Sequence, residues 1–272
     1  MERSLKGKIP VAVQFRAAAL ATYSFAVLAL LLLPVGVVVL ASFTRTSYLT
    51  IPPKGLTFRW YVEVLGSPSY VRSIVLSLGL ALTATAVAIL VAVPAAYALA
   101  RFRVAAANLL VALFLAPLAF PGIVVGVALL QLYSMMNIQP SIGRLLVAHL
   151  IITTPFVIRA VLATLRESSV DLEDAARVLG ASRWVAFRRV TLPLIRPAIV
   201  VGALFAFIAS FDNFPVSVFI LGARQITLPV KIFSSIEYGV DPSIAAVSTM
   251  VIVATGLILV AAERWTGLHR AF

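Results

Sequence analysis

The side chains that could carry out chemistry in this chain are few and scattered. The sequence contains no cysteine and only two histidines, His149 and His269, which are too far apart along the chain to suggest a metal site. It also lacks a Gly-x-x-x-x-Gly-Lys-Ser/Thr phosphate loop and a His-Glu-x-x-His zinc motif. His149 falls within an apolar stretch, where we expect a packed, hydrogen-bonded residue rather than a proton relay. These absences predict a protein that is not an enzyme and that binds no metal or nucleotide cofactor itself.

The composition points to a membrane protein. Of the 272 residues, 62% are hydrophobic and only 12% are charged, and the mean hydropathy is +1.07. A soluble domain has roughly 45–50% apolar and about 25% charged residues. A soluble globule of this size cannot bury so much apolar surface, so the expected fold class is an all-α integral membrane protein.

Six apolar stretches are long enough to cross a bilayer, which takes about 20 residues per helix. We expect spans at 18–42, 73–100, 105–133, 145–165, 194–221 and 242–262. The segments between them are short. The predicted organisation is a first helix with an outer loop (1–70), a core that holds the other five spans (71–263) and a short tail (264–272).

Basic residues indicate how these spans are oriented. If the N-terminus lies inside the cell, 15 of the 22 Lys and Arg residues fall on inner segments and 7 on outer segments. The positive-inside rule therefore predicts that both termini are cytoplasmic. Arg3, Lys6, Lys8 and Arg16 precede the first span, which is too long for a cleavable signal peptide and is interpreted as a retained anchor.

The third expected span holds an unusual cluster of helix-perturbing residues. Pro117, Pro121, Gly122 and Gly126 lie within ten residues of one another. The two glycines, one turn apart, allow the backbone of another helix to approach closely. Two interpretations remain open: a closely packed helix and a bent helix that lines a pathway.

The segment 166–193, between the fourth and fifth spans, is the longest inner loop. Its pattern predicts two short helices separated by Gly180, which suits the left-handed residue that ends a helix. Ser168 or Ser169 is expected to cap the first helix and Ser182 the second. Leu192-Pro193 is expected to end the second helix and to begin the next span. Acidic residues at the start of the first helix suit its dipole: Asp171, Glu173 and Asp174.

Both short helices are amphipathic. Leu172, Ala175, Ala176 and Leu179 share one face of the first, and Trp184 and Phe187 form a face of the second. Helices of two turns are unstable alone. Their apolar faces must therefore pack on the spans, on another protein or on both; a helix pair lying on the bilayer surface is the alternative.

The same segment resembles the cytoplasmic loop of binding-protein-dependent ABC importer permeases of type I. The family pattern is Glu-Ala-Ala, three residues, Gly, nine residues, Ile, one residue and Leu-Pro. This chain has Asp174-Ala175-Ala176, then Gly180, and later Val190, Leu192 and Pro193. Asp174 and Val190 are conservative departures from the pattern. The similar core runs from about Val71 to Glu263.

The resemblance implies a mechanism and partners. In this family the loop holds a coupling helix that docks on a cytoplasmic ABC ATPase. Two ATPase subunits bind ATP and Mg²⁺, a second permease subunit completes a heterodimer in the bacterial inner membrane, and an extracytoplasmic binding protein delivers the solute. The implied coupling residues are Asp174, Ala175, Ala176, Gly180, Arg183, Trp184, Phe187, Leu192 and Pro193. Arg183 is expected to pair with an acid on the ATPase, whereas Arg188 and Arg189 are expected to face lipid headgroups.

The outer part of the fifth expected span offers the candidate solute-pathway residues Phe211, Asp212 and Asn213. Asp212 is the only acid well inside an expected span, and such residues often mark pathways. The alternative is an acid that serves helix packing.

The stretches 210–222, 227–229 and 241–246 resemble spermidine/putrescine permeases, in particular the second of their two permease subunits. A polyamine is therefore the expected solute, and Asp212, Glu237 and Asp241 are outer acids that would attract a polycation. Phosphonate or ferric iron import is the alternative within the class. A secondary transporter is disfavoured because the chain offers few intramembrane ionisable groups.

Overall fold

The computed structural model describes residues 11–222, 225–239 and 241–266. Within these ranges the secondary structure is helical, and the only strand-like pairing is an isolated bridge between Thr44 and Leu56. Four residues named above lie outside the described ranges: Arg3, Lys6, Lys8 and His269.

The all-α membrane fold predicted from the sequence is confirmed. Five helical stretches in the described ranges are long and apolar enough to cross a membrane. They lie in α1 (Val11–Ala41), α3 (Pro68–Arg101), α6 (Ile142–Glu167), the continuous segment Arg183–Phe211 and α12 (Pro242–Thr266). The bent pair α4 (Ala107–Ala119) and α5 (Gly122–Met135) supplies a sixth span if it is counted as one.

The third span is not the single helix that we expected at 105–133. α4 and α5 meet at an angle of 107°, and Phe120 between them is extended, with φ −94° and ψ 142°. Phe120 precedes Pro121, whose ring disfavours helical backbone at the residue before it. The bend thus follows from Pro121, and the interpretation as a bent helix holds.

The two glycines of α5 also make the predicted close approach. A Cβ atom on Gly126 would lie 2.9 Å from the carbonyl oxygen of Pro215, and one on Gly122 would lie 3.1 Å from Pro215 Cβ. The backbone around Pro215 therefore fits against α5 only because these side chains are absent.

A Gly126→Val variant tests this contact. Because the obstacle is backbone as well as side chain, we expect a destabilisation of about 1–3 kcal/mol and a lower thermal midpoint of the purified protein. Gly66→Val is the control, since a Cβ at Gly66 meets nothing within 4 Å. Equal midpoints for the two variants would contradict the close approach.

The fifth span also differs from the helix expected at 194–221. It begins at α8 (Arg183–Ala186), continues through the π-helical turn η1 (Phe187–Thr191) and ends with α9 (Leu192–Phe211). The chain then turns, because Phe214 precedes Pro215 and is disfavoured in a helix, and because Asn213 Oδ1 accepts a hydrogen bond from Val216 N at 3.0 Å. A short helix follows, α10 (Ser217–Ile220).

Three further helices complete the described chain. α7 (Asp171–Val178) is the predicted first helix of the inner loop. α2 (Arg59–Gly66) and α11 (Leu228–Tyr238) were not expected, and both are short segments between spans.

The chain forms two compact units. One comprises residues 1–64 with 240–250. Its loop after α1 is ordered by a hydrogen bond from Trp60 Nε1 to the Thr44 carbonyl at 2.7 Å and by contact of the rings of Phe43, Phe58 and Tyr61. The other comprises residues 65–239 with 251–272 and contains the inner loop.

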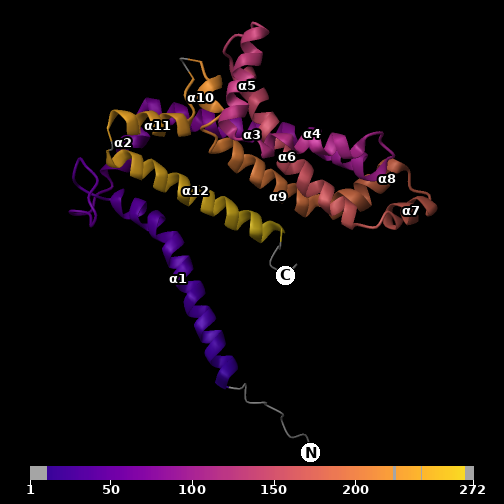
Figure 1. Ribbon diagram of the computed structural model, residues 1–272, viewed down its shortest axis with the longest axis horizontal. Coiled ribbons are helices and arrows are strands. Elements are labelled where there is room, and N and C mark those ends of the chain that lie inside the picture. The colour runs from indigo at the N-terminus through magenta and orange to yellow at the C-terminus, as the bar shows by residue number, and fades with distance from the viewer. Residues whose placement is uncertain (1–10, 223–224, 240, 267–272) are drawn as a thin grey trace, which may run out of the picture. The chain divides into compact units, whose positions relative to one another are not determined.

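The core of the second unit lies where α3, α6 and α9 run side by side (Figure 1). Small residues of α3 allow the close contact: Ala88, Ala92 and Ala96 are fully buried. Branched residues of α6, among them Val157 and Val161, fill the space beside them. This three-helix core supports the inner loop, because α6 leads into the loop and the segment Arg183–Phe211 leads out of it.

Candidate functional site

The inner loop begins where α6 ends, and its first two serines, Ser168 and Ser169, make different hydrogen bonds. Ser169 Oγ accepts a hydrogen bond from Asp171 N at 3.1 Å and donates one to the Asp171 carboxylate at 2.6 Å. Ser168 Oγ instead accepts from Arg101 Nη2 at 2.8 Å. Of the two predicted caps, Ser169 is thus the one that satisfies a backbone N–H at the start of α7.

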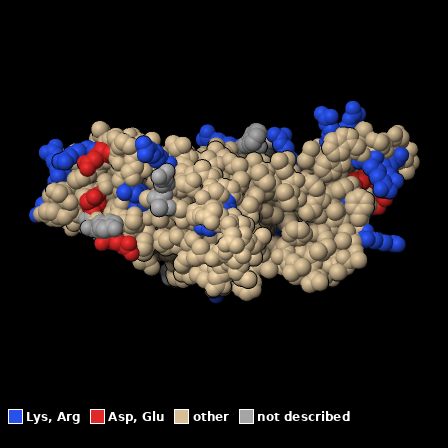
Figure 2. Space-filling view, turned by 90° about the horizontal axis from the view of Figure 1, so that it is seen from above, with Lys and Arg blue, Asp and Glu red and all other residues tan. Residues whose placement is uncertain are grey.

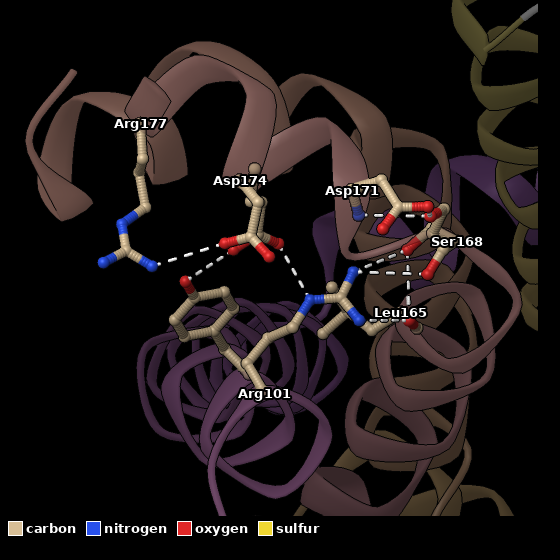
Figure 3. Close-up of polar contacts among 9 residues, drawn as sticks. Arg101, Leu165, Ser168, Asp171, Asp174 and Arg177 are labelled. Atoms are coloured by element: carbon tan, nitrogen blue, oxygen red, sulfur yellow. Dashed lines mark hydrogen bonds and ion pairs between the residues drawn. The ribbon is translucent and has the colours of Figure 1, made fainter. Parts of the chain in front are cut away.

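Arg101 and Glu173 join the loop to the membrane helices (Figure 3). Arg101, the last residue of α3, donates from Nε to Glu173 Oε1 at 2.8 Å and from Nη1 to the Leu165 carbonyl at 2.8 Å. Tyr97, one turn earlier, donates its hydroxyl to Glu173 Oε2 at 2.9 Å. The Arg101 and Glu173 side chains are only 6% and 12% exposed, so α3, α6 and α7 meet in one nearly buried ionic contact.

The surroundings of Glu173 favour its charged form. Burial raises the pKa of this carboxyl. The hydrogen bonds from Arg101 and Tyr97, together with the Arg101 charge, lower the pKa by more than burial raises it. The net pKa of Glu173 therefore lies below the ordinary value for glutamate. A carboxyl with a lowered pKa in the folded state stabilises that state above its unfolded pKa of about 4.3. That stabilisation is lost as the pH falls through the folded-state pKa.

We therefore expect the loop to loosen in acid. In the purified protein, proteolysis within residues 166–193 should be unchanged between pH 8 and 6 and should rise as the pH falls below about 4. Hydrogen exchange over the same residues gives an independent measurement. Loosening that is already complete at pH 6 would contradict the lowered pKa of Glu173.

The turn between the two loop helices has the predicted geometry. Gly180 adopts φ +92°, the left-handed conformation that glycine favours. Ser182 Oγ accepts a hydrogen bond from Val185 N at 3.3 Å and so caps α8. Both expectations are confirmed.

α7 buries one face and presents the other to solvent. Glu173 is the buried residue of this helix, whereas Val178 and Leu179 are 87% and 88% exposed and Leu172 is 52% exposed. Of the predicted coupling residues, Asp174 and Ala175 are exposed and Ala176 is half-buried. Asp174 accepts a hydrogen bond from Arg177 at 3.3 Å. The face of α7 expected to bind a partner is thus largely uncovered.

The second half of the loop lies against α3. Trp184, 68% exposed, stacks on Phe187 with ring centroids 5.7 Å apart. Phe187 in turn contacts Tyr97 edge to face at 5.0 Å. Figure 2 shows blue basic side chains around α7 and α8 at the right of the view, beside a largely uncharged helical surface.

The expectation that Leu192-Pro193 ends the second loop helix was wrong. The backbone stays helical from Arg183 to Phe211. Proline lacks an N–H and its ring clashes with the carbonyl four residues earlier in an α-helix. The wider π-helical turn η1, just before Leu192, makes room for that ring. The loop is therefore joined to the fifth span without a break.

The predicted pathway residues lie at the C-terminal end of α9. Phe211 stacks on Phe207 with centroids 5.8 Å apart. Asp212 is the residue after the last helical one and its side chain is exposed, so it is not well inside a span as expected. Asn213 uses its Oδ1 atom in the turn described above. The exposed carboxylate of Asp212 is accessible at the end of α9.

Two buried polar residues support this region. His149 is fully buried, with Nδ1 2.8 Å from Ser210 Oγ and Nε2 3.1 Å from Ser217 Oγ, which confirms the packed, hydrogen-bonded interpretation. Arg144, which sequence reasoning did not single out, donates to the Ile220 carbonyl at 2.8 Å and to the Ile138 carbonyl at 3.2 Å. It ties α6 to the ends of two neighbouring segments.

Comparisons with known proteins agree on one class. The family described as "Binding-protein-dependent transport system inner membrane component" matches residues 88–270. The spermidine/putrescine transport system permease protein PotC of Escherichia coli (strain K12) is 30% identical over 88% of this chain and 90% of its own length. The putrescine transport system permease protein PotI of the same strain is 33% identical, over 83% and 82%.

Two more comparisons widen the picture. A putative 2-aminoethylphosphonate transport system permease protein, PhnV of Salmonella paratyphi A, is 30% identical over 92% of this chain and 94% of its own length. A crystal structure of a bacterial ABC transporter that imports the acidic polysaccharide alginate contains a chain with the same fold. Its TM-score is 0.79 at 16% identity, with 96% of this chain and 99% of that chain covered.

Proposed function

Because the chain belongs to the family of binding-protein-dependent transport system inner membrane components and is an ABC importer permease, we propose that it couples two cytoplasmic ATPase subunits to the import of a polyamine. Its further partners are a second, different permease subunit and an extracytoplasmic binding protein. ATP and Mg²⁺ are held by the ATPase subunits, since this chain has no phosphate loop. Both termini are cytoplasmic.

The uncovered apolar face of α7 is the observation that carries the proposal. Val178 and Leu179 are almost fully exposed, although the opposite face of the same helix is fixed through Glu173. Exposed apolar residues on a rigid support suit a protein interface, in which a buried apolar centre provides most of the affinity. This supports α7 as the element that docks on an ATPase subunit.

The contacts that anchor α7 can transmit its movement to the membrane helices. Movement of α7 acts on α3 and α6 through Glu173, Arg101 and Ser168. It acts on the fifth span through the continuous helix that starts at Arg183. ATP-driven approach of two ATPase subunits would then shift three spans together, as alternation between inward- and outward-facing states requires.

A polyamine is the substrate that the relatives favour. PotC and PotI are named for spermidine or putrescine. The exposed carboxylates of Asp212 and Glu237 suit a cationic solute. The relative PhnV is named for a phosphonate, so 2-aminoethylphosphonate is the alternative substrate.

Co-purification tests the docking. In the assembled transporter, Leu179→Glu places a charge in the apolar interface, and we expect the ATPase subunits to bind at least about tenfold more weakly, because burying a leucine contributes about 1.5–3 kcal/mol. ATP-driven uptake should fall with it. The matched control Leu179→Met keeps an apolar side chain and should retain both. Undiminished binding by Leu179→Glu would contradict docking through α7.

Uptake into proteoliposomes tests the substrate. With the cognate binding protein present, we expect ATP-dependent uptake of radiolabelled putrescine or spermidine that 2-aminoethylphosphonate does not compete. If 2-aminoethylphosphonate is taken up instead and polyamines do not compete, the substrate is a phosphonate. Uptake without any ATPase subunit would contradict the whole mechanism.

A further inference from the structure

A groove beside the coupling loop has one apolar and one basic end. Its apolar part has a volume of about 330 Å³ and is lined by Pro94 and Ala98 of α3 and by a row of aromatic rings. Phe102, Tyr97, Phe187 and Trp184 follow one another with centroids 5.9, 5.0 and 5.7 Å apart.

Arg183 lies where this groove meets a polar pocket. The pocket, with a volume of about 180 Å³, is lined by three arginines and two acids: Arg101, Arg177, Arg183, Glu173 and Asp174. Arg101 pairs with Glu173, and Arg177 with Asp174. The two acids of the pocket therefore leave the Arg183 charge uncompensated, and the pocket as a whole attracts an anion.

The depth of the groove favours lipid over a soluble protein as its occupant. Pro94 lies seven residues before Arg101, about 10 Å along α3. The interfacial layer of a bilayer is only roughly 5–7 Å thick on each side. If Arg101 lies at the headgroup level, Pro94 lies among acyl chains, where a cytoplasmic ATPase does not reach. Trp184 is the second residue of the fifth span, near the membrane surface, where tryptophan is enriched.

We propose that this groove binds an anionic phospholipid of the cytoplasmic leaflet, its phosphate at Arg183 and an acyl chain along Pro94, Ala98 and Trp184. The inference rests on the proposed orientation, which places this end of α3 in the cytoplasm. It reassigns both Arg183 and Trp184 from ATPase contacts to lipid contacts. The occupied groove would link the lipid composition of the membrane to the coupling loop through the Tyr97 ring, whose hydroxyl bonds Glu173.

Quenching of Trp184 by brominated lipids tests the proposal in the complete transporter. The protein is reconstituted in nanodiscs that contain brominated phosphatidylglycerol or brominated phosphatidylcholine, and the signal of Trp184 is obtained by difference from Trp184→Phe. We expect half-maximal quenching at an about fivefold lower fraction of phosphatidylglycerol, the ratio that corresponds to the roughly 1 kcal/mol gained by one arginine at an anionic surface.

Variants separate the two ends of the site. Arg183→Gln should abolish the preference for phosphatidylglycerol, and Ala98→Leu should reduce quenching by both lipids because it fills the groove. Arg188→Gln and Ala112→Leu are the controls: Arg188 is exposed outside the groove, and Ala112 is exposed on α4. Both controls should quench as the wild type does.

Several outcomes would overturn the proposal. Equal quenching by the two lipids would exclude a specific site. Quenching that develops only after the ATPase subunits are removed would assign the groove to the ATPase. ATP-driven uptake is measured on the same samples, so a transporter that works without lipid preference would reject this site while leaving the proposed function intact.

Discussion

Replacing Glu173 by glutamine is expected to release the coupling loop while the membrane helices stay folded. The change removes the negative charge from a nearly buried ion pair and leaves the Arg101 guanidinium without its counter-charge. Breaking a buried pair from one side costs about 3–5 kcal/mol. We expect strongly increased proteolysis of residues 166–193 and uptake reduced at least about tenfold, because α7 would no longer transmit its movement to α3.

The control for this variant is Glu167→Gln, which removes the same charge at an exposed position six residues earlier. It should change loop protection and uptake little, since exposed charges contribute about 0–1 kcal/mol. Equal protection of the two variants would contradict an anchoring role for Glu173.

A double substitution distinguishes anchoring by charge from anchoring by packing. Buried ion pairs can often be replaced by apolar residues of similar volume without loss of stability. Arg101→Met combined with Glu173→Leu should therefore protect the loop better than Glu173→Gln alone. Arg101 also donates to the Leu165 carbonyl and to Ser168, so we expect partial rather than complete recovery. If the loop of the double variant is cleaved as readily as that of Glu173→Gln, the hydrogen bonds from Arg101 to α6 contribute most of the anchoring.

The ion pair also shows where sequence reasoning ended. The apolar runs predicted the spans, and local patterns predicted Gly180 at the turn and Ser182 at the cap, because each of these depends on neighbours within a few residues. Arg101 and Glu173 are 72 residues apart. The sequence patterns did not single out Arg101, and they indicated Glu173 only as one of three acids favoured by the helix dipole. Their pairing depends on the packing of α3 against α6, which a single sequence does not specify.

The sequence contains a local signal for the breaks in the third and fifth spans, but the hydropathy pattern predicted continuous spans. Phe120-Pro121 and Phe214-Pro215 both place a residue before proline, where helix is disfavoured. The uncharged run 104–143 continues through the first point, and the mainly apolar stretch 194–221 continues through the second. A count of apolar residues therefore joins the pieces. At Pro193 the error was the reverse: the proline predicted a helix end, but the π-helical turn before it lets the helix continue.

Gly202→Val is the other substitution with a large expected effect. A Cβ atom at Gly202 would lie 2.9 Å from Val157 Cα and 3.3 Å from the Phe156 carbonyl oxygen. Those are backbone atoms of α6, which cannot rotate away as a side chain can, so α6 and α9 would have to separate. Because Ala88 and Ala96 of α3 belong to the same buried cluster as Val157, the separation would loosen the whole three-helix core.

The expected result is a lower thermal midpoint and weaker uptake together. Overpacking typically costs about 1–3 kcal/mol, and each 1 kcal/mol shifts the midpoint of a protein of this size by roughly 2–4 °C. Gly79→Val on α3 is the matched control, because a Cβ there meets nothing within 4 Å. α6 and α9 carry the two ends of the coupling loop. Gly202→Val should therefore also weaken ATPase binding, although Gly202 lies far from the docking face. If Gly202→Val lowers the midpoint no more than Gly79→Val does, α6 and α9 are not in the close contact that positions the loop.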